Sequence, residues 1–176
     1  MAAHPLELEQ AIEITTMRRR HLRGVLKIEQ EVYPRPWSLG LFLSELALRT
    51  TRVYLVAKVG VTVVGYAGLM LTGSDGHITT IAVDPAWHRK GIGSRLLVEL
   101  SRLGIAAGCT ALTLEVRVSN EAAQEMYRRF GYAPAGVRKN YYAETNEDAL
   151  IMWAHDVDLA PYEARLDEIQ ARLDES

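Results

Sequence analysis

Residues 83–94 combine residue types that are suited to binding an anionic group. They read VDPAWHRKGIGS, and a helical pattern of leucines follows them. The first N–H groups of a helix have no partner within it, and the helix dipole adds partial positive charge there. Gly91 and Gly93 carry no Cβ and would let a ligand approach the backbone closely. Basic side chains suited to phosphate lie along the same turn, which predicts a diphosphate site: Arg89, Lys90 and Arg95.

The glycine spacing narrows the kind of diphosphate site. A P-loop requires Gly-x-x-x-x-Gly-Lys-Ser/Thr, which this segment does not contain. The dinucleotide-binding pattern Gly-x-Gly-x-x-Gly fails because residue 96 is Leu. Taken alone, the segment also fits a basic helix start whose glycines serve only the turn, so the rest of the chain must decide.

The composition describes one ordinary domain and disfavours several functional classes. The 176 residues are 48% hydrophobic, enough for a sizeable core, and the net charge of −2 gives no reason to expect nucleic-acid binding. Because no apolar run approaches roughly 18 residues and no apolar signal core opens the chain, we expect a cytoplasmic protein without membrane contact. The single cysteine, Cys109, is interpreted as a buried small hydrophobe. No His, Cys and Asp cluster has metal-ligand spacing, so no metal is implied.

Hydrophobic periodicity predicts the elements that must position residues 83–94. We expect a flexible leader at 1–10, one domain over 11–157, and a charged amphipathic helix or tail at 158–176, packed on its own domain or on a partner. Strands are predicted near residues 12–16, 52–59, 61–71, 77–83, 112–118, 132–138 and 149–155, with Gly65 and Gly68 at bulges or close approaches. Helices are predicted over residues 22–32, after Ser38, over 91–107 and after Asn120. This order predicts an α/β domain with a mixed sheet.

Three motifs together resemble the GNAT acetyltransferase superfamily over residues 12–155. They are the glycine turn after Val83, Leu114-Glu115-Val116-Arg117 followed by Asn120, and Tyr127-Arg128-Arg129-Phe130-Gly131-Tyr132. Within the superfamily, two further motifs are similar to the ribosomal-protein-alanine N-acetyltransferases (RimI): Pro36-Trp37-Ser38 with Phe42, and Arg138-Lys139-Asn140-Tyr141-Tyr142. One departure is His88, where family members usually carry Gln or Arg. We interpret His88 as tolerated, because backbone amides carry most of the phosphate contact and Arg89 and Lys90 compensate.

The resemblance implies a GNAT fold, a mixed sheet of about six to seven strands flanked by about four helices, with the C-terminal helix in addition. Acetyl-CoA, as co-substrate, would lie in a V-shaped opening between the strand that ends at Val83 and the strand that contains Glu115. Its pantetheine would pair like an added strand with the backbone of Ile81, Ala82 and Val83, and Asn120 would bond to it. Its diphosphate would lie on the amides of Arg89, Lys90, Gly91, Ile92, Gly93 and Ser94.

The resemblance also implies direct attack of an amine on the thioester. Glu115 would take the amine proton, directly or through a water, and Tyr127 would protonate the departing CoA sulfur. The Val83 N–H would hold the thioester oxygen as it becomes an oxyanion. Without the resemblance, Glu115 also fits a surface carboxylate paired with Arg117, and Tyr127 fits plain core packing. His77, on the strand before the glycine turn, is a rival base.

For the acceptor, the resemblance implies the N-terminal alanine of a small-subunit ribosomal protein, with additional protein N-termini as further partners. The first peptide residues would meet Trp37, Tyr141, Tyr142 and Glu144, although aromatic loop packing explains these side chains equally well. Two other functions stay open at this point: acetylation of a small amine such as a polyamine or aminosugar, and non-catalytic acyl-CoA binding by a regulator.

Overall fold

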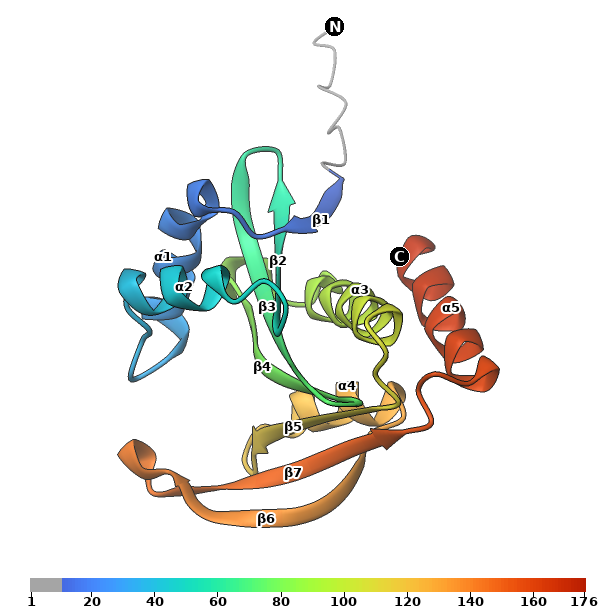
Figure 1. The fold of residues 1–176 in the computed structure, drawn as a ribbon. Coiled ribbons are helices and arrows are strands. Elements are labelled where there is room, and N and C mark those ends of the chain that lie inside the picture. The colour runs from blue at the N-terminus through green and yellow to red at the C-terminus, as the bar shows by residue number, and fades with distance from the viewer. Residues whose placement is uncertain (1–10) are drawn as a thin grey trace, which may run out of the picture.

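The computed structural model describes residues 11–176, so the leader expected at 1–10 lies outside the described residues. The elements are β1 Ile12–Thr16, α1 Leu22–Val32, α2 Leu39–Ala47, β2 Arg52–Val59, β3 Thr62–Thr72, β4 Asp75–Val83, α3 Ile92–Ala106, β5 Ala111–Arg117, α4 Glu121–Arg129, β6 Ala133–Tyr142, β7 Glu147–His155 and α5 Ala160–Asp174. The strands form one sheet in the order β1-β2-β3-β4-β5-β7-β6 (Figure 1). Its neighbouring pairs are antiparallel except β4 and β5, which confirms the predicted mixed sheet.

Helices cover both faces of the sheet. α1 and α2 pack on one face, and α3 packs on the other with α5 beside it (Figure 1). Side chains of a strand alternate between faces, and β2 divides its residues accordingly. Leu55, Ala57 and Val59 join the buried cluster on the α3 side, whereas Tyr54 and Val56 join the cluster under α1 and α2. The near-continuous apolar pattern of β2 therefore reflects burial from two sides.

Two helix starts lie where the sequence predicted them. Ser38 Oγ accepts a hydrogen bond from the Leu41 N–H at 3.2 Å and begins α2. Asn120 Oδ1 accepts from the Ala123 N–H at 3.1 Å and begins α4. Such side chains satisfy N–H groups that the helix itself leaves unpaired.

Gly68 confirms the predicted irregularity in β3. The register between β3 and β4 shifts between Gly68 and Leu69. A Cβ at residue 68 would lie 2.4 Å from Tyr54 Cε1 and 2.7 Å from Thr79 Oγ1, so only glycine fits there. A bulge of this kind bends the strand pair, and it falls opposite the residues at which β4 separates from its other neighbour.

β4 and β5 pair only at their beginnings and then diverge (Figure 1). Their parallel pairing covers Asp75–His77 against Ala111–Thr113. Beyond it, β4 continues to Val83 along β3, and β5 continues to Arg117 along β7. The predicted V-shaped opening is thereby confirmed, and the backbone of β4 after His77 has no strand partner on the β5 side.

The C-terminal residues form a helix that packs on its own domain. Tyr162 and Leu166 of α5 are buried in the same cluster as α3. On the surface, Arg102 of α3 pairs with Asp167 of α5 at 2.7 Å. Within residues 11–176, no helix combines the length and apolarity needed to cross a membrane.

Candidate active site

A cleft of about 1070 Å³ lies where β4 and β5 separate. Most of the predicted site residues line it: Trp37, Ile81, Ala82, Val83, Arg89, Gly91, Ile92, Gly93, Ser94, Glu115, Asn120, Tyr127, Tyr141 and Tyr142. Two predicted residues, Lys90 and Glu144, are not among those that line it. The cleft therefore brings residues from both sides of the sheet opening to one place.

The glycine turn leaves the start of α3 uncapped. Arg89 and Gly91 have positive φ angles of 63° and 72°, in the left-handed region that glycine adopts most easily. Turns that combine right-handed and left-handed backbone conformations point successive N–H groups into an anion-binding concavity. Among the residues that the structure describes, no side chain caps α3, so its first N–H groups, at Ile92 and Gly93, are not satisfied by a capping bond. This arrangement fits a diphosphate.

The basic side chains of this turn have different surroundings. Arg89 lines the cleft, whereas the Lys90 ammonium lies 5.8 Å from the centre of the Trp87 ring. Arg95 donates to Asp174 Oδ1 at 2.9 Å and to a backbone carbonyl of α5 at 2.5 Å. The prediction that Arg95 supplies charge to the phosphate turn is not supported, because this ion pair neutralises it.

Two carbonyl groups on the open edge of β4 contact side chains. The Tyr33 hydroxyl donates to the Ile81 carbonyl at 3.3 Å and lies 3.2 Å from Thr80 Oγ1. His88 Nε2 lies 3.2 Å from the Val83 carbonyl. The sequence predicted no role for Tyr33, and His88 was interpreted only as a tolerated departure. Both side chains stand at the strand edge along which a pantetheine chain would pair.

Glu115 has two side-chain partners, and Arg117 is neither of them. Glu115 Oε2 lies 2.5 Å from His77 Nε2, and Glu115 Oε1 accepts from Arg138 Nε at 3.1 Å. The Glu115 side chain is only 11% exposed. Arg117 pairs instead with Glu144 at 3.1 Å. The alternative of a surface pair between Glu115 and Arg117 is therefore wrong.

His77 and Glu115, the two candidate bases, form one hydrogen-bonded pair. His77 is the last residue of β4 that pairs with β5, opposite Thr113. Glu115 lies two residues beyond Thr113 and thus on the same face of the sheet. His77 Nδ1 is buried and has no hydrogen-bond partner within the described part of the chain.

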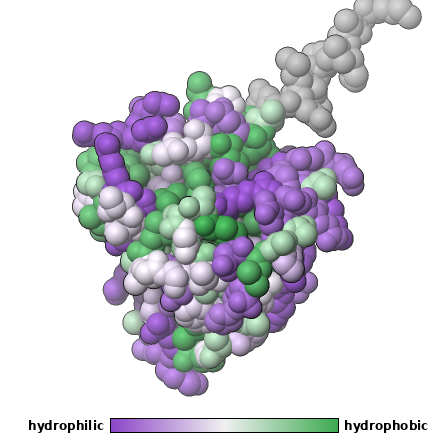
Figure 2. All heavy atoms as spheres, turned by 45° about the vertical axis from the view of Figure 1, so that its right-hand side comes forward, coloured by the Kyte–Doolittle hydropathy of each residue, from purple (hydrophilic) through white to green (hydrophobic). Residues whose placement is uncertain are grey.

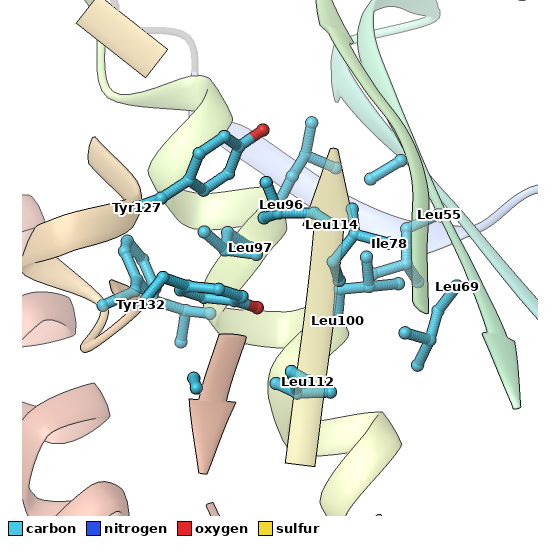
Figure 3. Close-up of a cluster of buried hydrophobic side chains, with 14 of the residues drawn as sticks. Leu55, Leu69, Ile78, Leu96, Leu97, Leu100, Leu112, Leu114, Tyr127 and Tyr132 are labelled. Carbon is cyan, nitrogen blue, oxygen red and sulfur yellow. The ribbon is translucent and has the colours of Figure 1, made fainter. Parts of the chain in front are cut away.

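Tyr127 belongs both to the core and to the cleft. Its ring is 8% exposed and is tilted against the Tyr132 ring, with 5.7 Å between centres. Figure 3 shows the Tyr127 hydroxyl pointing away from the packed side chains of Leu96 and Leu97. Burial raises the pKa of Tyr127 well above its ordinary value, so the phenol keeps its proton at neutral pH. The two interpretations of Tyr127 are thus compatible.

A buried carboxylate also lines the cleft. Glu29 of α1 is 4% exposed, and its Oε1 accepts from the Trp37 backbone N–H at 2.9 Å. Its Oε2 accepts from the Tyr66 hydroxyl. No role was predicted for Glu29, although an acidic residue among the apolar positions of α1 is a signal that its carboxylate is buried against specific partners.

Glu144 supports an aromatic wall from behind. It pairs with Arg117, and the Arg117 guanidinium lies 3.9 Å from the centre of the Tyr142 ring. Tyr142 contacts Tyr141 edge to face at 5.1 Å. Burial raises the pKa of Tyr142 to about 12. Tyr141 and Tyr142 line the cleft as predicted, while Glu144 acts through Arg117 rather than on the cleft itself.

Comparison with known proteins places this arrangement in an established class. The model of the acetyltransferase (GNAT) family matches residues 22–132, and the chain belongs to this family of acyltransferases. It is 36% identical over 149 residues to the N-alpha-acetyltransferase RimI of Mycobacterium tuberculosis, covering 81% of this chain and 92% of the relative.

Two solved structures illustrate the likeness. The ribosomal-protein-S18-alanine N-acetyltransferase from Escherichia coli superposes with a TM-score of 0.75 at 30% identity, covering 83% of this chain and 94% of that one. The PaiA N-acetyltransferase from Thermoplasma acidophilum, solved in complex with coenzyme A, shares the fold with a TM-score of 0.70 at 17% identity, covering 82% and 99%.

Proposed function

We propose that this protein is an acetyl-CoA-dependent N-alpha-acetyltransferase that modifies the N-terminal alanine of a small-subunit ribosomal protein. The observation that carries the proposal is the divergence of β4 from β5, because it opens a cleft with the glycine turn, Glu115 and Tyr127 along its walls. The substrate is carried over from the E. coli enzyme, which acts on the alanine of protein S18.

Acetyl-CoA binds chiefly through the backbone. Its pantetheine pairs with β4 at residues 81–83, on the edge where β5 no longer provides a strand partner. Its diphosphate lies on the amides of residues 89–94, at the uncapped start of α3. Lys90 takes part through its amide, since its side chain lies against Trp87. Asn120 bonds to the pantetheine with its amide group, while its Oδ1 also caps α4.

The transfer is a single attack followed by loss of the thiolate. The substrate amine gives up its proton to Glu115, directly or through a water, and its nitrogen attacks the thioester carbonyl carbon. The Val83 N–H donates to the oxyanion that forms. The intermediate collapses with cleavage of the carbon–sulfur bond, and Tyr127 gives its proton to the sulfur. His77 shares the proton that Glu115 receives, because the two groups are hydrogen bonded.

An α-amino acceptor fits a site with one hydrogen-bonded pair of candidate bases, His77 and Glu115, better than a lysine does. The amine must be neutral to attack, and an α-amino group titrates near ~7.8 whereas lysine titrates near ~10.4. This gap corresponds to about 3.5 kcal/mol of deprotonation at neutral pH. The first residues of the peptide lie between Trp37 and the Tyr141–Tyr142 pair, whose rings line the acceptor end of the cleft.

The proposal is tested by acetyl transfer to defined acceptors. A peptide that begins with the alanine of protein S18 should be acetylated on its α-amino group, as located by mass spectrometry. The same peptide with a blocked N-terminus is the matched control and should not react. Faster turnover of a polyamine or an aminosugar would replace the proposed acceptor by a small amine. Acetyl-CoA binding without transfer to any acceptor would indicate a regulator.

The base is tested by comparing two substitutions. Glu115→Gln should lower turnover by ~10²–10⁴-fold, the usual range for a general base, with nearly unchanged acetyl-CoA affinity. Raising the pH should recover part of the loss, because more of the acceptor amine is then neutral. His77→Ala should cost less than Glu115→Gln. A much larger loss in His77→Ala would identify the imidazole as the base.

A further inference from the structure

A second cavity lies beside the glycine turn. It measures about 750 Å³, is open to solvent, and is bordered by the turn, the end of α4 and one side of α5. Gly91, Ser94 and Arg129 line both this cavity and the main cleft. Two of these three residues, Gly91 and Ser94, belong to the turn on which the diphosphate is proposed to lie, so the two hollows meet there. A coenzyme whose pantetheine enters the main cleft has its nucleotide end on the other side of that diphosphate.

The second cavity is both basic and apolar. Its charged lining residues are Arg129, Arg165, Arg172 and Glu168, which leaves an excess of positive charge. Arg165 donates to the Arg129 backbone carbonyl at 3.1 Å, and Arg172 pairs with Glu168 at 2.6 Å. Guanidinium groups match the geometry of phosphate oxygens. The uncharged lining is largely apolar and suits the flat face of a purine: Phe130, Pro161, Ala164, Ile169 and Leu173.

α5 is fixed against the glycine turn, which places the backbone of Arg165 and Arg172 beside the cavity. Leu173 Cδ2 lies 2.8 Å from the position that a Cβ on Gly91 would take. Arg95 of α3 anchors the end of α5 through Asp174 at 2.9 Å. Figure 2 brings the α5 side of the molecule forward, and hydrophilic side chains gather over much of this face. α5 also lies outside residues 22–132, which the family model matches.

We propose that this cavity binds the adenosine 3′-phosphate end of acetyl-CoA, with Arg165 and Arg172 of α5 contacting the 3′-phosphate. The inference rests on acetyl-CoA being the co-substrate, as proposed above. It gives α5 the function of recognising the 3′-phosphate, which the glycine turn does not contact in the proposed binding mode. It also explains why Arg95 turns away from the phosphate turn: its ion pair with Asp174 holds α5 at the cavity.

The experiment compares the affinities of acetyl-CoA and 3′-dephospho-acetyl-CoA by calorimetry at low ionic strength. The unsubstituted protein should bind acetyl-CoA about tenfold more tightly than the dephospho form, since two charge-assisted contacts are involved. The double variant Arg165→Gln, Arg172→Gln should lose most of this preference. Its affinity for the dephospho form should stay the same, which a merely structural role of the two arginines would not predict.

Two single substitutions serve as controls of opposite kind. Arg102→Gln removes the same charge and another contact with α5, but Arg102 does not line the cavity, so the preference for acetyl-CoA should persist. Glu168→Gln removes the negative charge beside Arg172 and should increase the preference by about twofold. Equal affinity of the unsubstituted protein for both thioesters would overturn the inference and leave acetyl-CoA as co-substrate. Binding of neither thioester would overturn the proposed function as well.

Discussion

The substitution Tyr127→Phe separates chemistry from packing at the proposed acid. Phenylalanine keeps the ring that packs against Tyr132 at 5.7 Å. Within residues 11–176, no hydrogen bond engages the Tyr127 hydroxyl, and that hydroxyl points away from the packed leucines (Figure 3). Removing the hydroxyl should therefore change the free energy of unfolding by less than about 1 kcal/mol.

The effect on turnover should be far larger. Loss of a positioned proton donor typically costs ~10²–10⁴-fold in rate. At about 1.36 kcal/mol for each factor of ten, this corresponds to roughly 2.7–5.4 kcal/mol of activation free energy. Affinity for acetyl-CoA should hardly change, because the proton is needed only as the sulfur leaves. Burial raises the pKa of Tyr127, so the unsubstituted enzyme should not lose activity through ionisation of this phenol at mildly alkaline pH.

The assay follows release of the free CoA thiol at saturating acetyl-CoA and peptide, together with thermal unfolding of each variant. Tyr132→Phe is the matched control: it removes the same group from the neighbouring ring, which is 3% exposed and does not line the cleft. Tyr132→Phe should keep full turnover. If Tyr127→Phe also turns over at the unsubstituted rate, Tyr127 is a core residue and the acid lies elsewhere.

Further predictions concern the phosphate turn, a buried histidine and a buried carboxylate. Gly93→Glu should weaken acetyl-CoA binding at least about tenfold and Gly93→Gln much less, as measured by calorimetry, because only the first brings negative charge to the diphosphate. Gly91→Glu should block binding too but also lower the melting temperature, since residue 91 has φ +72° and would press on α5. Burial lowers the pKa of His21 below its ordinary 6.5, with nearby Arg20 next in effect, so the folded state favours the neutral ring. Stability should therefore be complete above pH 6.5 and fall as the pH drops below it, and urea unfolding of His21→Gln should show a weaker pH dependence. Tyr66→Phe should reduce the free energy of unfolding by about 1–3 kcal/mol, because it leaves a buried carboxylate with one partner fewer.

The elements were predictable because the signals that define them are local. Ser38 and Asn120 cap helices with their own side chains, within three residues along the chain. The alternation that predicted a strand around Glu115 also placed its side chain on the polar face of β5. The glycine turn was also predictable from a local signal, because Gly91 has a positive φ angle that most other residues avoid.

The partners across the site were not predictable, because they depend on which strands lie side by side. The pairing of His77 with Glu115 spans 38 positions and follows from the short parallel contact between β4 and β5. Glu115 and Arg117 lie two residues apart on one strand, so the sequence offered their pairing as an alternative, but each has its partner on a neighbouring element. Likewise, the positive charge of Arg95 suggested a contact with phosphate, and only the position of α5 shows that Arg95 forms an ion pair with Asp174 instead.

Glu29 shows how a sequence can mark a residue without revealing its purpose. A carboxylate without partners is costly to bury, so its place among the apolar positions of α1 requires compensation. The structure supplies it from two directions, the Trp37 N–H in the connection to α2 and the Tyr66 hydroxyl in β3. One carboxylate thus fixes the segment that carries Trp37 to the helix and to the sheet. Because Trp37 lines the cleft, the burial of Glu29 sets the position of one of its walls, the wall proposed to meet the peptide.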